Sequence, residues 1–195
     1  MRRKIHKEDI LHAGKELIHK FGFNAVSIKD ITEKVGIPKG SFYNHFKSKD
    51  EFLVEVVNTY ALESFDLIQK HLLNSPFSPI QRLKNYFNEA IEFYGSDLER
   101  LNGCLIGNIC QELGNVSPEL QVLLEQNLSG ANDIIANIIN EGIDLGEINY
   151  SLDVYELVNF ITNSWQGALL RMKATGNNTP LYTFKNILFN HILLN

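Results

Sequence analysis

The residues best suited to chemistry lie close together between Ser27 and Phe46, in the stretch SIKDITEKVGIPKGSFYNHF. Phe42 and Phe46 are four residues apart, so on a helix they share one face that would pack inward. The opposite face then carries side chains suited to phosphates and to base edges. These residues are Lys39, Ser41, Tyr43, Asn44 and His45, and Gly40 among them allows a close approach of the backbone to DNA.

Two short helices joined by a tight turn would position these residues. Ser27 and Asp30 have the spacing of a capping box and predict a helix over 28–35 that ends at Gly36. Pro38 then predicts the start of a helix over 39–46. This pattern is typical of a DNA-binding helix–turn–helix, in which the second helix inserts its first residues into the major groove.

The charge distribution supports an anion-binding front part. Residues 1–50 hold eleven Lys/Arg and six Asp/Glu, whereas residues 51–195 hold seven and seventeen, and the net charge is −5. Such asymmetry indicates an anion-binding module joined to something else. Composition alone leaves open a basic surface with no such role.

The rest of the chain predicts helices and no strands, so the expected fold class is all-α with about nine helices. We expect an N-terminal DNA-binding domain over 1–47 and a ligand-sensing and dimerisation domain over 48–195. Apolar spacing, glycine stops and Ser, Thr or Asp caps place the helices at 7–21, 28–35, 39–46, 49–73, 80–95, 104–113, 118–142, 153–174 and 179–193.

The stretch GIPKGSFYNHFKSKDEF resembles the helix–turn–helix of the TetR family of bacterial transcriptional repressors. The resemblance implies a homodimer that binds a palindromic double-stranded DNA operator and is released when a small molecule acts on the C-terminal domain. It also implies DNA contacts for matching residues. Ser27, Tyr43 and Lys49 would contact phosphates, Lys39, Gly40, Asn44 and His45 would lie at or near the bases, and Ser41 could serve either way.

Residues 103–108, 117–120 and 166–173 resemble the electrophile-responsive subgroup that includes the repressor of N-ethylmaleimide reductase and the acrylate-responsive repressors. The sensing cysteine of that subgroup matches Cys104, and its lysine in the penultimate helix matches Lys173. A helix start lowers the pKa of a thiol, which suits such a role. Position alone favours instead a small buried apolar cysteine. Release by a non-reactive ligand is the competing hypothesis.

Aromatic and aliphatic residues of the second half have two interpretations each. Trp165 and Tyr94 would line a ligand cavity, although plain core packing is the simpler reading of each alone. Cys110 is expected in the core. The last two helices carry more apolar surface than one small core needs, which predicts a homodimer interface.

No sequence feature indicates an enzyme, a cofactor or a metal site, and no apolar run is long enough for a membrane span. Two cysteines and no secretory signal indicate a cytoplasmic protein. The alternative function is an all-helical protein-interaction module whose basic front part binds no specific DNA sequence.

Overall fold

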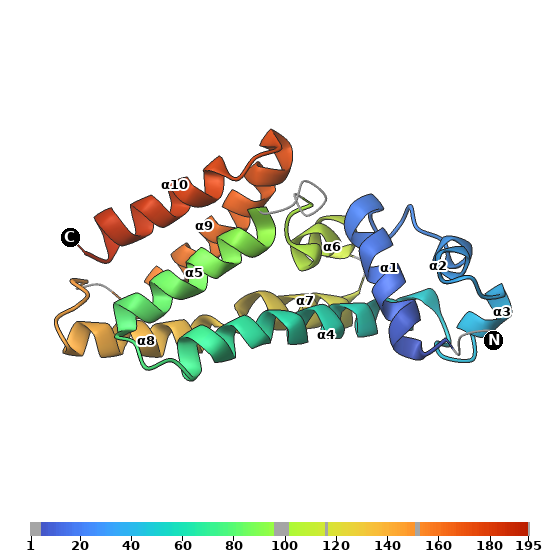
Figure 1. Ribbon diagram of the computed structural model, residues 1–195, viewed down its shortest axis with the longest axis horizontal. Helices are drawn as coiled ribbons and strands as arrows, with labels where there is room; N and C mark the ends of the chain where they lie inside the picture. The colour runs from blue at the N-terminus through green and yellow to red at the C-terminus, as the bar shows by residue number, and fades with distance from the viewer. Residues whose placement is uncertain (1–4, 96–101, 116, 151–152, 195) are drawn as a thin grey trace. The chain divides into compact units, whose positions relative to one another are not determined.

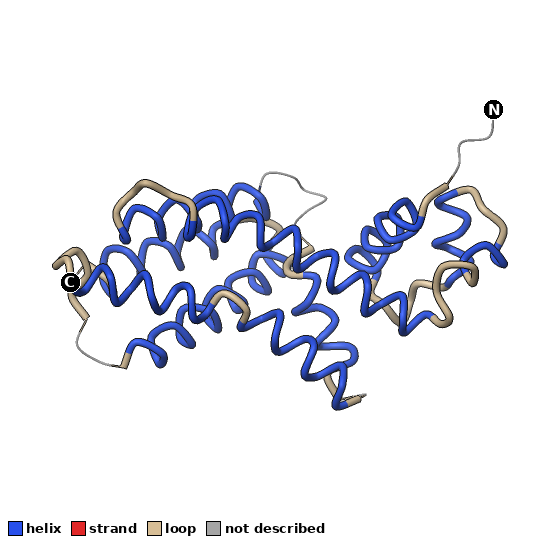
Figure 2. Tube along the Cα trace, turned by 90° about the horizontal axis from the view of Figure 1, so that it is seen from below, coloured by secondary structure: helices blue, strands red, loops and turns tan. Residues whose placement is uncertain are grey.

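The computed structural model describes residues 5–95, 102–115, 117–150 and 153–194. Within these ranges the chain consists of helices, loops and turns, with no strand (Figure 2). The all-α prediction is confirmed.

The helices follow one another along the chain as labelled in Figure 1. They are α1 (Lys7–Phe21), α2 (Ile28–Val35), α3 (Lys39–Phe42), α4 (Lys49–Ile68), α5 (Pro79–Gly95), α6 (Leu105–Leu113), α7 (Pro118–Ser129), α8 (Asn132–Asp144), α9 (Val154–Thr175) and α10 (Thr179–Ile187). Short π-helical turns at Gln69–Leu73 and Leu188–Ile192 continue α4 and α10.

Contacts divide the chain into two compact units. The first unit is Met1–Glu63 with Leu105–Glu125, and the second is Ser64–Cys104 with Gln126–Asn195. The predicted DNA-binding domain of residues 1–47 is part of the first unit, which also includes α6. The boundary after residue 47 stays a prediction.

Two predicted helices differ in length from the observed ones. The helix expected over 39–46 is regular only to Phe42, after which the N–H of His45 bonds to the carbonyl of Phe42 at 3.0 Å and closes a tighter turn. The helix expected over 118–142 is divided into α7 and α8 next to Gly130. Glycine destabilises a helix interior by about 1 kcal/mol relative to alanine, which favours a break there.

Three phenylalanines form the centre of the first unit. The ring centroids of Phe42, Phe46 and Phe52 lie 4.9–5.3 Å from one another, and all three side chains are buried. Gly14 of α1 makes room for them, because a Cβ at this position would overlap the ring of Phe52. The expectation that Phe42 and Phe46 face inward is confirmed. Phe21, at the end of α1, is by contrast 58% exposed.

Helices α5, α8, α9 and α10 build the core of the second unit. Its buried residues come from several segments far apart in the sequence, and α9 contacts both α8 and α10 while α5 contacts α8. Helices α9 and α10 contact each other and run side by side as an antiparallel pair (Figure 1). Gly176, with φ +66°, ends α9 in the left-handed region and allows the chain to turn back.

We expect Phe52→Ala to reduce the free energy of unfolding by about 3–5 kcal/mol, because it removes a buried ring from the aromatic cluster. Phe21→Ala removes the same side chain from an exposed position and should cost less than about 1 kcal/mol. Urea titrations followed by circular dichroism measure both changes. Equal losses would show that the cluster is not the centre of this unit.

Candidate nucleic-acid interface and sensor region

The start of α2 is closed by a reciprocal set of hydrogen bonds. The N–H of Asp30 donates to Ser27 Oγ at 3.2 Å, while the N–H and the hydroxyl of Ser27 donate to Asp30 Oδ2 at 2.7 and 2.6 Å. These bonds hold the pKa of Asp30 below its usual range. The predicted capping box is confirmed. The hydroxyl proton of exposed Ser27 is thus already engaged, and a phosphate would have to compete with Asp30 for it.

The segment Lys39–Phe46, called here the reading segment, presents its polar residues outward. Phe42 and Phe46 are 0% and 1% exposed, whereas Tyr43 is 50% exposed. The other predicted contact residues of this segment are exposed or partly exposed, namely Lys39, Gly40, Ser41, Asn44 and His45. A Cβ at Gly40 would meet nothing within 4 Å, so the packing of the protein itself does not require glycine at this position.

Most lysines of the first unit already have partners. Four are in ion pairs, namely Lys7–Glu55 at 2.6 Å, Lys34–Glu16 at 2.5 Å, Lys29–Glu33 at 3.6 Å, and Lys15–Glu63. The ammonium groups of Lys39 and Lys47 have no ion pair, hydrogen bond or ring contact with any residue in the described ranges. These two lysines stand at the start of the reading segment and directly after its end.

The ammonium group of Lys49 has partners inside the protein, whereas the resemblance implied a phosphate contact. Its Nζ donates a hydrogen bond to the carbonyl of Phe23 at 2.6 Å and lies 4.1 Å from the centroid of the Phe23 ring. Burial lowers the pKa of Lys49, and the charges of Asp50, Glu112 and Asp30 act in the opposite direction. The side chain is therefore directed at the turn between α1 and α2.

Glu112 of α6 holds the same turn and was missed by sequence reasoning. Its carboxylate accepts hydrogen bonds from the N–H groups of Phe23 at 3.2 Å and Asn24 at 3.0 Å. Gly22, with φ +87°, makes room for it, because a Cβ there would overlap the carboxylate. Nothing in the sequence marks this contact, since Glu112 lies 89 residues after Phe23.

In the second unit, the residue before Cys104 lies against the segment of α9 that carries Lys173. Gly103, with φ +75°, lies against α9, and a Cβ added to it would be 3.5 Å from the carbonyl oxygen of Leu169 and 3.9 Å from Cβ of Lys173. Cys104 follows directly, is 8% exposed and immediately precedes α6. Tyr86 is a neighbour of Cys104 that sequence reasoning missed. Burial, with a smaller contribution from Cys104, raises the pKa of the Tyr86 hydroxyl to about 12.

The predicted cavity residues Trp165 and Tyr94 belong to an aromatic cluster. The ring of Trp165 lies 5.4 Å from Phe87, 5.3 Å from Phe184 and 6.2 Å from Tyr94, centroid to centroid. Both residues are partly buried. This arrangement is typical of side chains that pack the helices together.

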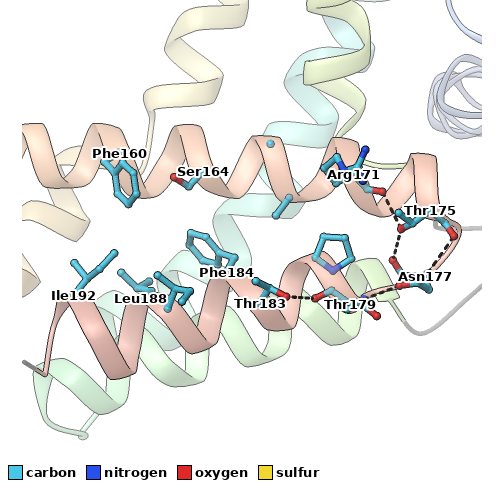
Figure 3. A pocket seen from close by; sticks show the side chains of 14 residues that line it. Phe160, Ser164, Arg171, Thr175, Asn177, Thr179, Thr183, Phe184, Leu188 and Ile192 are labelled. Atoms are coloured by element: carbon cyan, nitrogen blue, oxygen red, sulfur yellow. Dashed lines mark hydrogen bonds between the residues drawn. The ribbon is translucent and has the colours of Figure 1, made fainter.

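An open groove of about 600 Å³ lies between α9 and α10 (Figure 3), and its lining residues include none of Cys104, Lys173, Trp165 and Tyr94. Phe160 and Ile192 lie at its apolar end, and Arg171, Thr175 and Asn177 lie at its polar end (Figure 3). Further lining residues are Ser164, Gly167, Ala168, Thr179, Pro180, Thr183, Phe184, Ile187 and Leu188.

Metal-binding clusters and membrane-spanning helices are both absent from the described ranges. No group of three or more His, Cys, Asp or Glu residues in them is arranged to hold a metal ion. Nor does any helix that the structure describes have the length and apolar character needed to cross a membrane.

Two family models match the chain. The model described as "Bacterial regulatory proteins, tetR family" matches residues 10–56, which include the reading segment. The model described as "Tetracyclin repressor-like, C-terminal domain" matches residues 79–188. Together they cover most of both units.

Individual relatives agree with this match. The chain is 33% identical over 187 residues to the HTH-type transcriptional repressor DhaR of Mycobacterium sp. (strain GP1), across 96% of this chain and 92% of that protein. The crystal structure of regulatory protein TetR from Rhodobacter sphaeroides is 26% identical, has a TM-score of 0.87, and covers 95% of this chain and 98% of its own.

The match to the expected subgroup is more distant. The HTH-type transcriptional repressor NemR of Escherichia coli (strain K12) is 22% identical over 90% of this chain and 87% of its own length. That identity supports the family and does not single out the electrophile-responsive subgroup. The relatives are transcriptional regulators, and the chain belongs to the TetR family as a DNA-binding transcriptional repressor.

Proposed function

We propose that this repressor reads a palindromic operator with its reading segment, acts as a homodimer through α9 and α10, and is released by an electrophile that modifies Cys104. The outward polar face of the reading segment, fixed by buried Phe42 and Phe46, carries the DNA-reading part. Regulators of this family bind operators as homodimers. A two-fold symmetric dimer matches a palindrome, because each half-site receives an identical reading segment.

Each exposed residue of the interface has a chemical role in this proposal. Amide and imidazole groups can bond to base edges in the major groove, while lysine and phenol groups suit phosphates. We assign base edges to Asn44 and His45, phosphates to Tyr43 and Ser27, a position at the bases to Lys39 and Gly40, and either partner to Ser41.

We expect Asn44→Ala to weaken binding of the operator about 10–100-fold and to leave binding of unrelated duplex DNA nearly unchanged, because a bidentate base contact contributes about 1–3 kcal/mol of discrimination. Lys39→Ala also removes a positive charge near the phosphates, so it should weaken binding of both the operator and the unrelated duplex. Fluorescence anisotropy measures these affinities, with an operator selected by the wild-type protein from random duplexes and a shuffled duplex beside it.

Lys29→Ala is the matched control, because Lys29 is an exposed lysine of α2 outside the reading segment. It should change operator affinity by less than about threefold, as expected for a surface substitution. If Asn44→Ala reduced binding to both duplexes equally, Asn44 would not read sequence.

The groove between α9 and α10 supports dimerisation by these helices. Phe160 is 53% exposed and Ile187 is 44% exposed, and both line the groove. Such apolar exposure on two long antiparallel helices matches the pairing of four helices across a two-fold axis. A second copy would cover these side chains and remove them from water.

We expect Phe160→Asp to convert the dimer to a monomer, because a buried unpaired carboxylate costs several kcal/mol. Operator affinity should fall with it, since a monomer contacts one half-site. Phe77→Asp places the same change on a loop phenylalanine that is 55% exposed and outside the groove, and it should remain dimeric. Sedimentation velocity measures both masses. A dimeric Phe160→Asp protein would place the interface elsewhere.

The surroundings of Cys104 support covalent sensing. Cys104 lies directly before α6, and the Gly103 turn holds it beside the segment of α9 that carries Lys173. An adduct on an almost fully buried thiol adds volume where the packing has little room. The resulting shift would favour a conformation that binds the operator less well.

We expect N-ethylmaleimide to release the wild-type protein from its operator and to add one adduct that Cys104→Ser cannot form. Cys110→Ser is the matched control and should still be released. Intact-protein mass and anisotropy, measured on the same samples, check both outcomes. Release of Cys104→Ser to the wild-type extent would reject the covalent switch, and release without an added mass would indicate a reversible ligand.

A further inference from the structure

The turn between α1 and α2 is held from two sides by charged groups. The Glu112 carboxylate accepts from the N–H groups of Phe23 and Asn24, and the Lys49 ammonium donates to the carbonyl of Phe23. Phe23 is only 6% exposed. Phe23 and Asn24 thus bind an anion through their N–H groups and a cation through the carbonyl between them, and both charges have a fixed partner.

The same contacts limit what Lys49 can do at DNA. To reach a phosphate, its ammonium would have to leave the Phe23 carbonyl and the Phe23 ring, which lies 4.1 Å from Nζ. Removing a hydrogen-bond partner from a buried carbonyl is costly, because water does not replace it. The position of Lys49 therefore suits a role inside the first unit.

Lys47 has the opposite arrangement, with a fixed backbone and a free charge. Its N–H donates to Glu51 Oε2 at 2.6 Å, and the N–H of Glu51 donates to Ser48 Oγ at 3.0 Å, so these two bonds fix the chain at the start of α4. Its exposed ammonium has no partner in the ranges that the structure describes. Lys47 can bind an anion without breaking an internal contact.

We propose that Lys47 contacts the operator backbone in place of Lys49, and that Lys49 and Glu112 are positioning residues that hold the Phe23 turn and thereby the reading segment. The proposal depends on the DNA-reading role given above. Lys49 begins the helix that follows the reading segment, and Glu112 fixes the turn that precedes α2, so the two residues hold both flanks of the helix–turn–helix.

The dependence of operator affinity on salt separates the two lysines. Each phosphate contact contributes about 0.9 to the slope of log affinity against log salt concentration, so Lys47→Gln should reduce the slope by about 1.8 for the two subunits of a dimer. Lys49→Gln should lower affinity while leaving that slope nearly unchanged. Lys29→Gln is the control for loss of a lysine charge alone. A larger slope change for Lys49→Gln than for Lys47→Gln would overturn the proposal.

Glu112→Gln tests the positioning role, because positioning and electrostatics predict opposite changes in operator affinity. Loss of a negative charge from a DNA-binding unit should tighten binding by electrostatics alone, as expected for the exposed control Glu33→Gln. We expect Glu112→Gln to weaken binding about tenfold, because its amide NH₂ would face a backbone N–H. Tighter binding would overturn the role.

Hydrogen exchange tests the same contacts without DNA. The amides of Phe23 and Asn24 should exchange faster in Glu112→Gln and in the milder Glu112→Asp, while those in the middle of α4 keep their protection. Unchanged exchange at Phe23 and Asn24 would overturn the positioning role. A wild-type protein that selects no operator would instead reject the DNA-reading role, and with it the assignment of Lys47.

Discussion

The DNA-reading surface depends on the burial of Phe42 and Phe46 against Phe52. Helix α3 has four residues, and a helix of that length is not stable in water by itself. The aromatic contacts supply the missing stability, and the turn after Phe42 brings Phe46 back to the same cluster. Exposure of the intervening polar residues follows from this packing, because they occupy the side of the segment that the phenylalanines do not.

Free charge, and not net charge, distinguishes the reading segment from the rest of the first unit. Surface ion pairs such as Lys7–Glu55 and Lys34–Glu16 contribute little to stability, yet they neutralise the lysines that form them. Lys39 and Lys47 keep unpaired ammonium groups with respect to the described residues. The basic composition of residues 1–50 pointed to the correct region, but the partners of each lysine show which charges remain available there.

Sequence reasoning succeeded where neighbouring residues determine the structure. The Ser27–Asp30 cap, the end of α2 at Gly36 and the inward face of the reading segment all follow from spacings of three or four residues. The contact of Glu112 with the Phe23 turn could not be predicted in this way, because it joins segments 89 residues apart. The direction of Lys49 depends on the same turn, so its likeness to a phosphate-binding position said nothing about its internal hydrogen bond.

Helix α9 carries both the segment next to the sensor candidates and the groove proposed for dimerisation, within the second unit. At about 100° per residue, Leu169 and Lys173 lie on one side of α9, opposite Phe160 and Arg171. Leu169 and Lys173 lie next to Gly103, whereas Phe160 and Arg171 line the groove. In the proposed dimer, volume added at Cys104, which follows Gly103, would act on the side of α9 opposite the groove. Since packed helices shift as rigid elements, the proposed sensing by Cys104 and the proposed subunit pairing would be coupled through one helix without a separate relay.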